Sequence, residues 1–239
     1  MLQNRRTKKN CIFGKMKAAF AFTLLVLCFV SCKKDQANSN LHYEYFGLLP
    51  GRFVEYDVIE IHHDVNQNIK HDTLRYQLKT VIGDTLIDNE GRIARRFVRY
   101  KRGDSTQPWL QTDIWTAIIV DRRAELVEEN QRLIKMVFAP TEDKKWNLNA
   151  FNSQDELNAY YRDIHSKRIL GGQLFDSCLV VEQEDFFSLI DYRRKYETYS
   201  KNIGLISKYY KDLKIVGFDT TNVQFGKELY FDCYAFGFE

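Results

Sequence analysis

The chain has 239 residues, of which 44% are hydrophobic and 14% aromatic, so it has ample apolar material for one folded core. Its formal net charge is +3, but six of its 35 lysines and arginines lie in residues 1–31, a segment without acids. The remainder has 29 bases against 32 acids, a net charge of −3. A mildly acidic chain does not favour a nucleic-acid partner.

Residues 1–31 have the pattern of a secretory signal peptide. The stretch up to Lys17 is basic, and residues 18–30 contain no charge. This apolar run is shorter than the roughly 20 residues that a membrane-spanning helix needs, and small residues follow it. We therefore expect a signal helix that is removed from the mature protein. Translation could start at Met1 or at Met16, because Met16 and Lys17 would open a compact signal by themselves.

Val30, Ser31 and Cys32 resemble the end of a bacterial lipobox. The resemblance implies cleavage before Cys32 and attachment of lipid to its sulfur and its new amino group. The alternative is an ordinary cleaved signal that happens to contain Cys32. Several acyl chains anchor a protein stably, because each buried methylene contributes about 0.8 kcal/mol. Residues 32–40 would then form the lipidated start and a polar, flexible tether.

Cys178 and Cys233 are the two cysteines that remain in the mature domain once Cys32 is lipidated. In an oxidising envelope compartment they could form a disulfide. Both lie in apolar, strand-like runs, which suits two buried free thiols equally well. Sequence alone cannot place their Cα atoms within bridging distance, so both alternatives stay open.

Residues 41–239 read as one antiparallel β domain. Apolar residues alternate with polar ones, as at Val54, Tyr56 and Val58, and turn residues such as Pro50-Gly51 and Gly83-Asp84 separate the runs. Short strands between frequent turns are typical of an all-β fold. The expected strands are 52–62, 73–82, 93–102, 109–120, 124–127, 133–138, 175–182, 195–200, 205–210 and 229–238.

The stretch 153–166 gives conflicting signals. Ser153 to Glu156 forms a capping box, and Leu157, Tyr160 and Ile164 follow at helical spacing. This local pattern favours a helix of three turns over 155–166. A family resemblance instead implies a strand over 158–166, and we expect the strand.

Three stretches carry that resemblance: residues 45–58 (YFGLLPGRFVEYDV), 172–177 (GQLFDS) and 199–206 (YSKNIGLI). They resemble landmarks of a family of uncharacterised Bacteroidota lipoproteins. The resemblance implies an antiparallel meander that is curled into a half-barrel, similar to the periplasmic carriers of lipoproteins. It implies no catalytic residue.

The sequence contains no recognisable catalytic set. Gly-x-Ser-x-Gly, His-Glu-x-x-His and Cys-x-x-Cys motifs are absent, so we expect no metal and no cofactor. His62 and His63 would point to opposite faces of a strand, and His62 could meet His71 across a hairpin. Glu182, Glu184 and Asp185 are interpreted as a strand end that meets water. An envelope hydrolase that acts on glycan or lipid stays open as an alternative, because carboxylate separations cannot be read from a sequence.

A concave sheet could bind an apolar ligand. The weak candidates for its lining are Tyr56, Tyr76, Tyr100 and Trp109. The alternative is that a helix or loop fills the hollow and that these aromatic residues belong to the core. Arg95, Arg99 and Lys101 share one strand face, which is interpreted as solvated rather than as a site for an acidic partner.

These observations together predict a non-catalytic lipoprotein of the bacterial cell envelope, anchored to the outer rather than the inner membrane. Its expected role is binding or scaffolding, with an apolar ligand or an envelope protein as partner.

Overall fold

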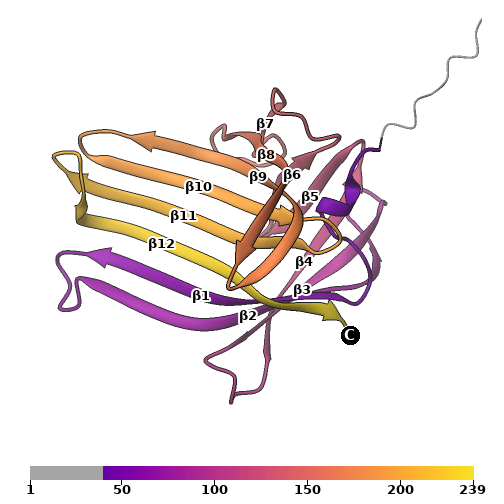
Figure 1. Ribbon diagram of the computed structural model, residues 1–239, viewed down its shortest axis with the longest axis horizontal. Helices are drawn as coiled ribbons and strands as arrows, with labels where there is room; N and C mark the ends of the chain where they lie inside the picture. Colours follow the sequence, from indigo (N-terminus) through magenta and orange to yellow (C-terminus); the bar gives the residue numbers. More distant parts are fainter. Residues whose placement is uncertain (1–39) are drawn as a thin grey trace, which may run out of the picture. The chain divides into compact units, whose positions relative to one another are not determined.

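Residues 40–239 are described by the structure, a computed structural model, and they form one twelve-stranded antiparallel sheet (Figure 1). The expected all-β fold is confirmed for this part of the chain. The expected signal helix, the cleavage at Cys32 and nearly all of the tether lie outside the described residues. A single turn of 3₁₀ helix, η1 (Tyr43–Tyr45), precedes the first strand.

The twelve strands range in length from three residues in β7 to twenty in β12. They are β1 (Arg52–Asp64), β2 (His71–Ile87), β3 (Ile93–Arg102), β4 (Leu110–Val120), β5 (Arg123–Glu128), β6 (Gln131–Val137), β7 (Lys145–Asn147), β8 (Asn158–Leu170), β9 (Gln173–Phe187), β10 (Asp191–Ser200), β11 (Gly204–Val216) and β12 (Asp219–Phe238).

The sheet is a meander in which the first and last strands pair at the centre. Its order is β6-β5-β4-β3-β2-β1-β12-β11-β10-β9-β8-β7. Apart from β1 and β12, all strands that neighbour each other in this order are consecutive in the chain. In the register, Tyr56 of β1 lies between Leu78 of β2 and Cys233 of β12. Strong local pairing of this kind explains why alternation in the sequence was sufficient to predict most of the strands.

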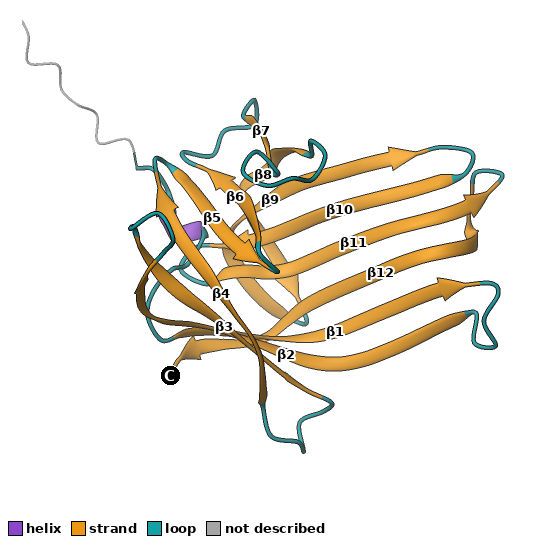
Figure 2. Ribbon diagram, turned by 180° about the vertical axis from the view of Figure 1, so that it is seen from behind, coloured by secondary structure: helices purple, strands orange, loops and turns teal. Residues whose placement is uncertain are grey.

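Two regions of the sheet differ in shape. The halves of β1, β2 and β9–β12 that are drawn towards the left of Figure 1 form a flat arm, whereas β3–β8 curl round at the other end (Figures 1 and 2). The edges of the curl approach each other: Ile134 N of β6 donates to Leu148 O after β7 (2.9 Å), and the Trp146 indole donates to Ile134 O (2.8 Å). The curled region is therefore a nearly closed barrel, held across its gap largely by side chains.

The main hydrophobic core fills the curled region. It contains buried residues from both wings of the sheet, including Met136, Tyr161 and Leu179, and it is joined by Tyr45 of η1. A second cluster surrounds Tyr56, Phe231 and Cys233, and a third, small cluster lies in the arm at Leu213, Ile215 and Val223. The arm therefore has much less apolar cover than the curl.

Residues 158–170 form strand β8, which confirms the strand expected there and rules out the helix. The capping-box residues Ser153 to Glu156 lie in the preceding loop. Ladder pairing with β9, for example between Tyr161 and Val181, outweighs the helical spacing of the apolar residues.

The turn predicted at Gly83-Asp84 is wrong. Ile82 pairs with Phe97 and Thr85 pairs with Arg95, so Gly83 and Asp84 form an irregularity inside β2 rather than its end. A bulge bends a strand without ending it, and a Gly-Asp pair serves either purpose. Here it lets one strand run from the arm into the curl.

Cys178 and Cys233 are both buried and free, so the structure contains the pair of thiols rather than a disulfide. Within residues 40–239 no helix has the length and hydropathy that crossing a bilayer would require.

Candidate functional site

A cavity of about 270 Å³ lies inside the curled region. Much of its wall is apolar, because inward-facing positions of seven neighbouring strands meet there. These apolar residues are Val54, Tyr56, Leu78, Ile82, Phe97, Trp115, Leu126, Leu205, Leu229 and Phe231. The segment before β1 adds Phe46 and Gly47, so this segment covers part of the hollow without filling it.

Charged side chains are grouped at one part of this cavity. Lys135 Nζ of β6 lies 2.8 Å from Glu197 Oε1 of β10 and 3.5 Å from Glu128 Oε1 of β5. Lys208 Nζ of β11 lies 3.7 Å from Glu197, and the Tyr199 hydroxyl donates to Glu197 Oε2 at 2.6 Å. The cavity is therefore amphipathic, with apolar walls and a buried ionic cluster.

A bulge places Lys135 in this cluster. Ala124 of β5 pairs with Met136 and Glu125 pairs with Ile134, which leaves Lys135 as the extra residue of β6. Bulges re-aim side chains in this way. Lys135 is consequently 5% exposed although it lies between two buried apolar residues.

The charges of the cluster stabilise one another. Burial alone would lower the pKa of Lys135, but the carboxylates of Glu197 and Glu128 outweigh it and raise this pKa to about 12. Burial would raise the pKa of Glu197, but Lys135 and Lys208, with the Lys135 and Tyr199 hydrogen bonds, lower it to about 2. Burial and the adjacent Glu197 raise the pKa of Tyr199, which keeps its hydroxyl as a neutral donor.

Arg52, at the start of β1, lines the same cavity and differs from the lysines. Its buried Nε has no hydrogen-bond acceptor among residues 40–239, and its guanidinium lies over the Phe238 ring at 3.9 Å. Burial lowers the pKa of Arg52. The described residues thus give the cavity one cation for which they provide no carboxylate partner.

Only one of the four aromatic candidates lines the cavity. Tyr56 is 1% exposed and donates its hydroxyl to Leu205 O (2.8 Å). Tyr76 pairs with Val58 on the same face, but it lies further towards the arm and donates to Glu60 (2.9 Å). Tyr100 pairs with Lys79, which puts it on the opposite face of the sheet.

Trp109 lies just before β4, under the Arg102 guanidinium at 4.1 Å, and is not a lining residue. The tryptophan of the cavity is instead Trp115 of β4. The sequence pattern shows a strand there but cannot show how far along the strand the curl begins.

The interpretation of Arg99 as part of a solvated face is wrong. Arg99 lines the cavity next to Trp115, with its guanidinium 4.2 Å from that ring, and lies 3.4 Å from Asp113. Pairing of Arg99 with Thr80, whose face is buried, turns this face of β3 inward. Lys101, further along the same strand, is exposed.

The interpretation of Glu182 as a residue at a wet strand end is also wrong. Glu182 is 1% exposed and lies in the middle of β9, where its carboxylate is 2.5 Å from Arg162. Burial raises the pKa of Glu182, and Arg162 opposes this effect. Glu184 pairs with Arg193 and Lys195, and Asp185 pairs with Arg194.

The histidines pair differently from the prediction. His63, not His62, lies opposite His71 across the β1–β2 hairpin, with their Nδ1 atoms 2.8 Å apart. His63 Nε2 contacts Glu228 (3.0 Å), while His62 contacts Glu60 on the other face (2.8 Å). In the part of the chain that the structure describes, no group of three or more potential ligands could hold a metal ion.

Sequence reasoning missed the residues that make the cavity amphipathic. Two signals were present: a single lysine, Lys135, inside an apolar strand, and an acid, Glu197, two residues before the inward-facing Tyr199. Comparison with protein-family models gives no match, and no curated protein matches the chain in sequence.

Proposed function

We propose that this protein is a non-catalytic lipoprotein of the bacterial cell envelope that binds an amphipathic molecule with an acidic head group in the cavity of its curled sheet. The single observation that supports this most is that Arg52 lines the cavity beside its apolar wall and has no carboxylate partner among residues 40–239. An apolar pocket with a few polar groups is the usual form of a ligand site. A buried N–H without an acceptor is costly, and a carboxylate or phosphate at the half-buried Arg52 would satisfy its Nε.

The lipid anchor on Cys32 and membership of the Bacteroidota lipoprotein family are parts of this proposal that rest on sequence. They suit a binding protein held at a membrane, from which acyl chains or similar amphiphiles could be taken up. A location at the outer membrane belongs to the same proposal.

The alternative of an envelope hydrolase has less support. Glu197 and Glu128 do converge, but they converge on Lys135. Because the pKa of Glu197 is lowered to about 2, this carboxylate cannot serve as a proton donor near neutral pH. An ion-paired cluster of this kind is more typical of a structural or binding role.

Bromine quenching of Trp115 tests the proposal, since Trp115 lines the cavity and the other two tryptophans do not. We expect saturable quenching by 12-bromododecanoate, and roughly 10- to 100-fold weaker binding of 12-bromododecanol, because a hydrogen bond to a charged group contributes about 1.5–3 kcal/mol. Trp115→Phe should abolish the saturable component.

Arg52→Gln should reduce the affinity for the acid to that for the alcohol, whereas the matched change Arg75→Gln, at an exposed position of β2, should leave both unchanged. Absence of saturable quenching by either probe would overturn the binding proposal. Equal affinity for the two probes would overturn only the part of the proposal that gives the ligand an acidic head group.

A further inference from the structure

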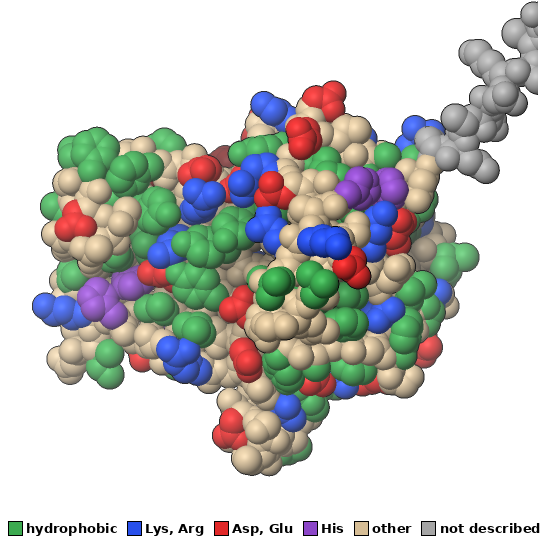
Figure 3. Space-filling model, in the orientation of Figure 1, with side chains coloured by type: hydrophobic (Ala, Val, Ile, Leu, Met, Phe, Trp, Pro, Cys, Tyr) green, Lys and Arg blue, Asp and Glu red, His purple; other side chains and the backbone are tan. Residues whose placement is uncertain are grey.

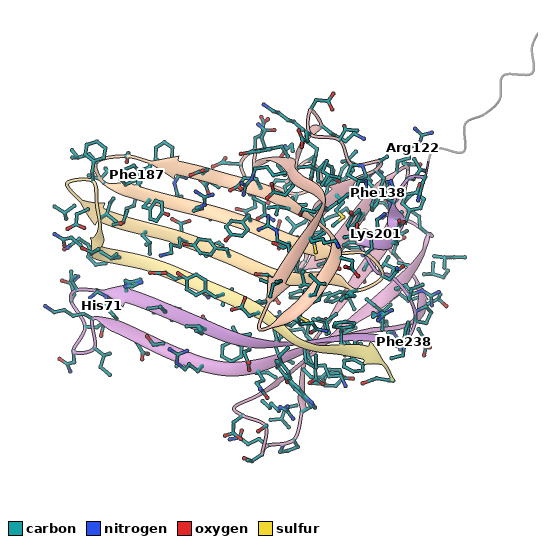
Figure 4. The ribbon with its side chains drawn as sticks, viewed as in Figure 1. His71, Arg122, Phe138, Phe187, Lys201 and Phe238 are labelled. Atoms are coloured by element: carbon teal, nitrogen blue, oxygen red, sulfur yellow. The ribbon has the colours of Figure 1, made fainter. Side chains whose placement is uncertain are left out.

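The free end of the arm has an uncharged, apolar tip. It consists of residues 186–190 (FFSLI) at the β9–β10 turn and 216–218 (VGF) at the β11–β12 turn. Leu189, Ile190 and Phe218 are 54%, 57% and 56% exposed, and Phe186, Phe187 and Val216 are also exposed. The space-filling view shows hydrophobic side chains gathered at this end, where Phe187 lies (Figures 3 and 4).

The two turns form one contiguous surface. Ile215 N donates to Ile190 O (2.9 Å), and Phe218 N donates to Leu189 O (3.3 Å). The Phe187 and Phe218 rings are in edge contact, with centroids 5.6 Å apart. Apolar patches of this kind on a soluble surface mark interaction sites more often than chance.

Phe218 has a backbone conformation that stability alone would not select. Its φ is +62° and that of the preceding Gly217 is +68°. Two successive positive φ values belong to a hairpin turn in which Asn and Gly are strongly preferred, and a bulky residue there is strained. Such an outlier at an exposed position points to a function for the side chain.

The charged residues behind the tip are paired with one another. Arg194 contacts Asp185 (3.2 Å), Arg193 contacts Glu184 (2.8 Å), and Lys214 contacts Asp191. Asp219, which directly follows Phe218, is the exception, because its carboxylate accepts hydrogen bonds from the Thr221 backbone N–H and hydroxyl and contacts no basic side chain. The described residues thus give the tip no unpaired basic group that could bind an anionic lipid or an acidic protein. The recognition that its exposed side chains offer is apolar.

We infer that this tip inserts into the interfacial region of a lipid bilayer. It is the protruding end of two hairpins rather than a groove, and it lies at the end of the domain opposite η1 (Figure 1). A stable protein interface takes about 20–30 residues on each partner, many more than the eight residues of the tip, whereas the apolar face of a membrane-bound helix enters the head-group region by only about 5–10 Å. This membrane contact is independent of the cavity and of any anchor on Cys32.

Vesicle co-sedimentation of residues 40–239 tests the inference. This segment contains all twelve strands and all three core clusters, so it holds the complete fold, and it lacks Cys32. We expect it to pellet with zwitterionic phosphatidylcholine vesicles and to remain bound in high salt, because salt screens charge interactions and not the insertion of apolar side chains. Loss of binding in high salt would overturn the insertion.

Leu189→Ser/Ile190→Ser and, separately, Phe218→Asn should each reduce the bound fraction at least several-fold. Asn tolerates the positive φ of position 218, so that variant should fold at least as well as the original chain. The control is Ile93→Ser/Leu110→Ser, which removes two exposed apolar residues on β3 and β4.

Besides loss of binding in high salt, three results would overturn the inference: no pelleting of the original segment, undiminished pelleting of the tip variants, or equal losses in the control. Light scattering on the same samples tests the other possible occupant of the tip, a second copy of this chain. If the tip residues are needed for self-association and not for vesicle binding, a second copy of this chain covers the tip instead.

Discussion

Lys135 and Glu197 form the central contact of the cavity, and neither side chain reaches water to any useful extent. Their separation of 2.8 Å is close, but a buried pair offsets its own desolvation only when further groups complete its hydrogen bonds. Tyr199 and Lys208 contribute these bonds and charges to Glu197, and Glu128 does so for Lys135. The cluster should therefore behave as a unit.

We predict that Lys135→Met destabilises the protein by about 3–5 kcal/mol, because it leaves Glu197 buried with weaker compensation. The double change Lys135→Met/Glu197→Gln should cost clearly less than the sum of the single changes. Urea denaturation followed by circular dichroism measures these free energies. Lys227→Met, which removes one of the three partners of Glu60 at a more exposed position, should cost no more than about 1 kcal/mol. Additive single effects would show that the two side chains are independent.

The lowered pKa of Glu197 makes stability depend on acid pH. A carboxyl group whose pKa falls from its usual 4.5 to about 2 on folding contributes stability that is present above pH 4.5 and is lost as the pH falls towards 2. We expect this group to account for about 3 kcal/mol of the loss over that window. Unfolding free energies at pH 7, 4 and 2.5 should fall less steeply for Glu197→Gln than for the unaltered protein. Parallel curves would contradict this.

At the scale of the element, long strands pass from the flat arm into the curl without ending. β2 does so through the irregularity at Gly83 and Asp84, and β12 passes close to β11 at Gly226. A Cβ atom on Gly226 would lie 2.1 Å from Asp212 O and 2.9 Å from Leu213 Cα, and the φ of Gly226 is +132°. Backbone cannot give way as a flexible side chain can, so only glycine fits there.

Gly226→Ala should therefore destabilise the protein by about 1–3 kcal/mol or more, through both steric overlap and backbone strain. Gly91→Ala is the matched control. Gly91 also has a positive φ of +76°, but nothing lies within 4 Å of its added Cβ, so this variant measures the strain alone. Thermal melts of the two variants compare them directly. An equal effect of both changes would mean that β11 moves aside at no cost.

At the scale of the whole molecule, the sequence predicted most of the strands but did not predict which residues of a strand line the cavity. Alternation predicted the face on which Tyr56 lies, because that face is set residue by residue along β1. It could not predict that Tyr76, on the same face, lies outside the cavity. The position along a strand at which a sheet curls depends on bulges and on pairing between distant strands, which no single strand reveals.

The charged lining shows the same limit. Lys135 reaches the cavity through a bulge. Arg52 is the first residue of β1, where alternation does not yet show on which face of the sheet a side chain lies. The barrel closes through contacts between β6 and the segment around β7, which follow one another in the chain but lie at opposite edges of the sheet. The alternation of residues within one strand does not show to which edge of a sheet that strand belongs.

The uneven core predicts uneven dynamics. Three buried apolar residues form the cluster of the arm, whereas fifteen form the main cluster of the curl. Local opening costs less where little apolar surface is buried. In hydrogen exchange followed by mass spectrometry, amides of β1 and β12 near Asp64 and Phe225 should exchange faster than those near Val54 and Phe236 in the same strands. Uniform protection along these strands would contradict the prediction.

The two free thiols have a practical consequence. Burial raises the pKa of Cys233 to about 12 and also raises that of Cys178, so neither is a thiolate at neutral pH. Alkylating reagents can react with these thiols only when the strands around the two sulfurs separate. The alkylation rate of each sulfur therefore reports how often the β9 and β12 regions open, and no reporter group has to be introduced to measure it.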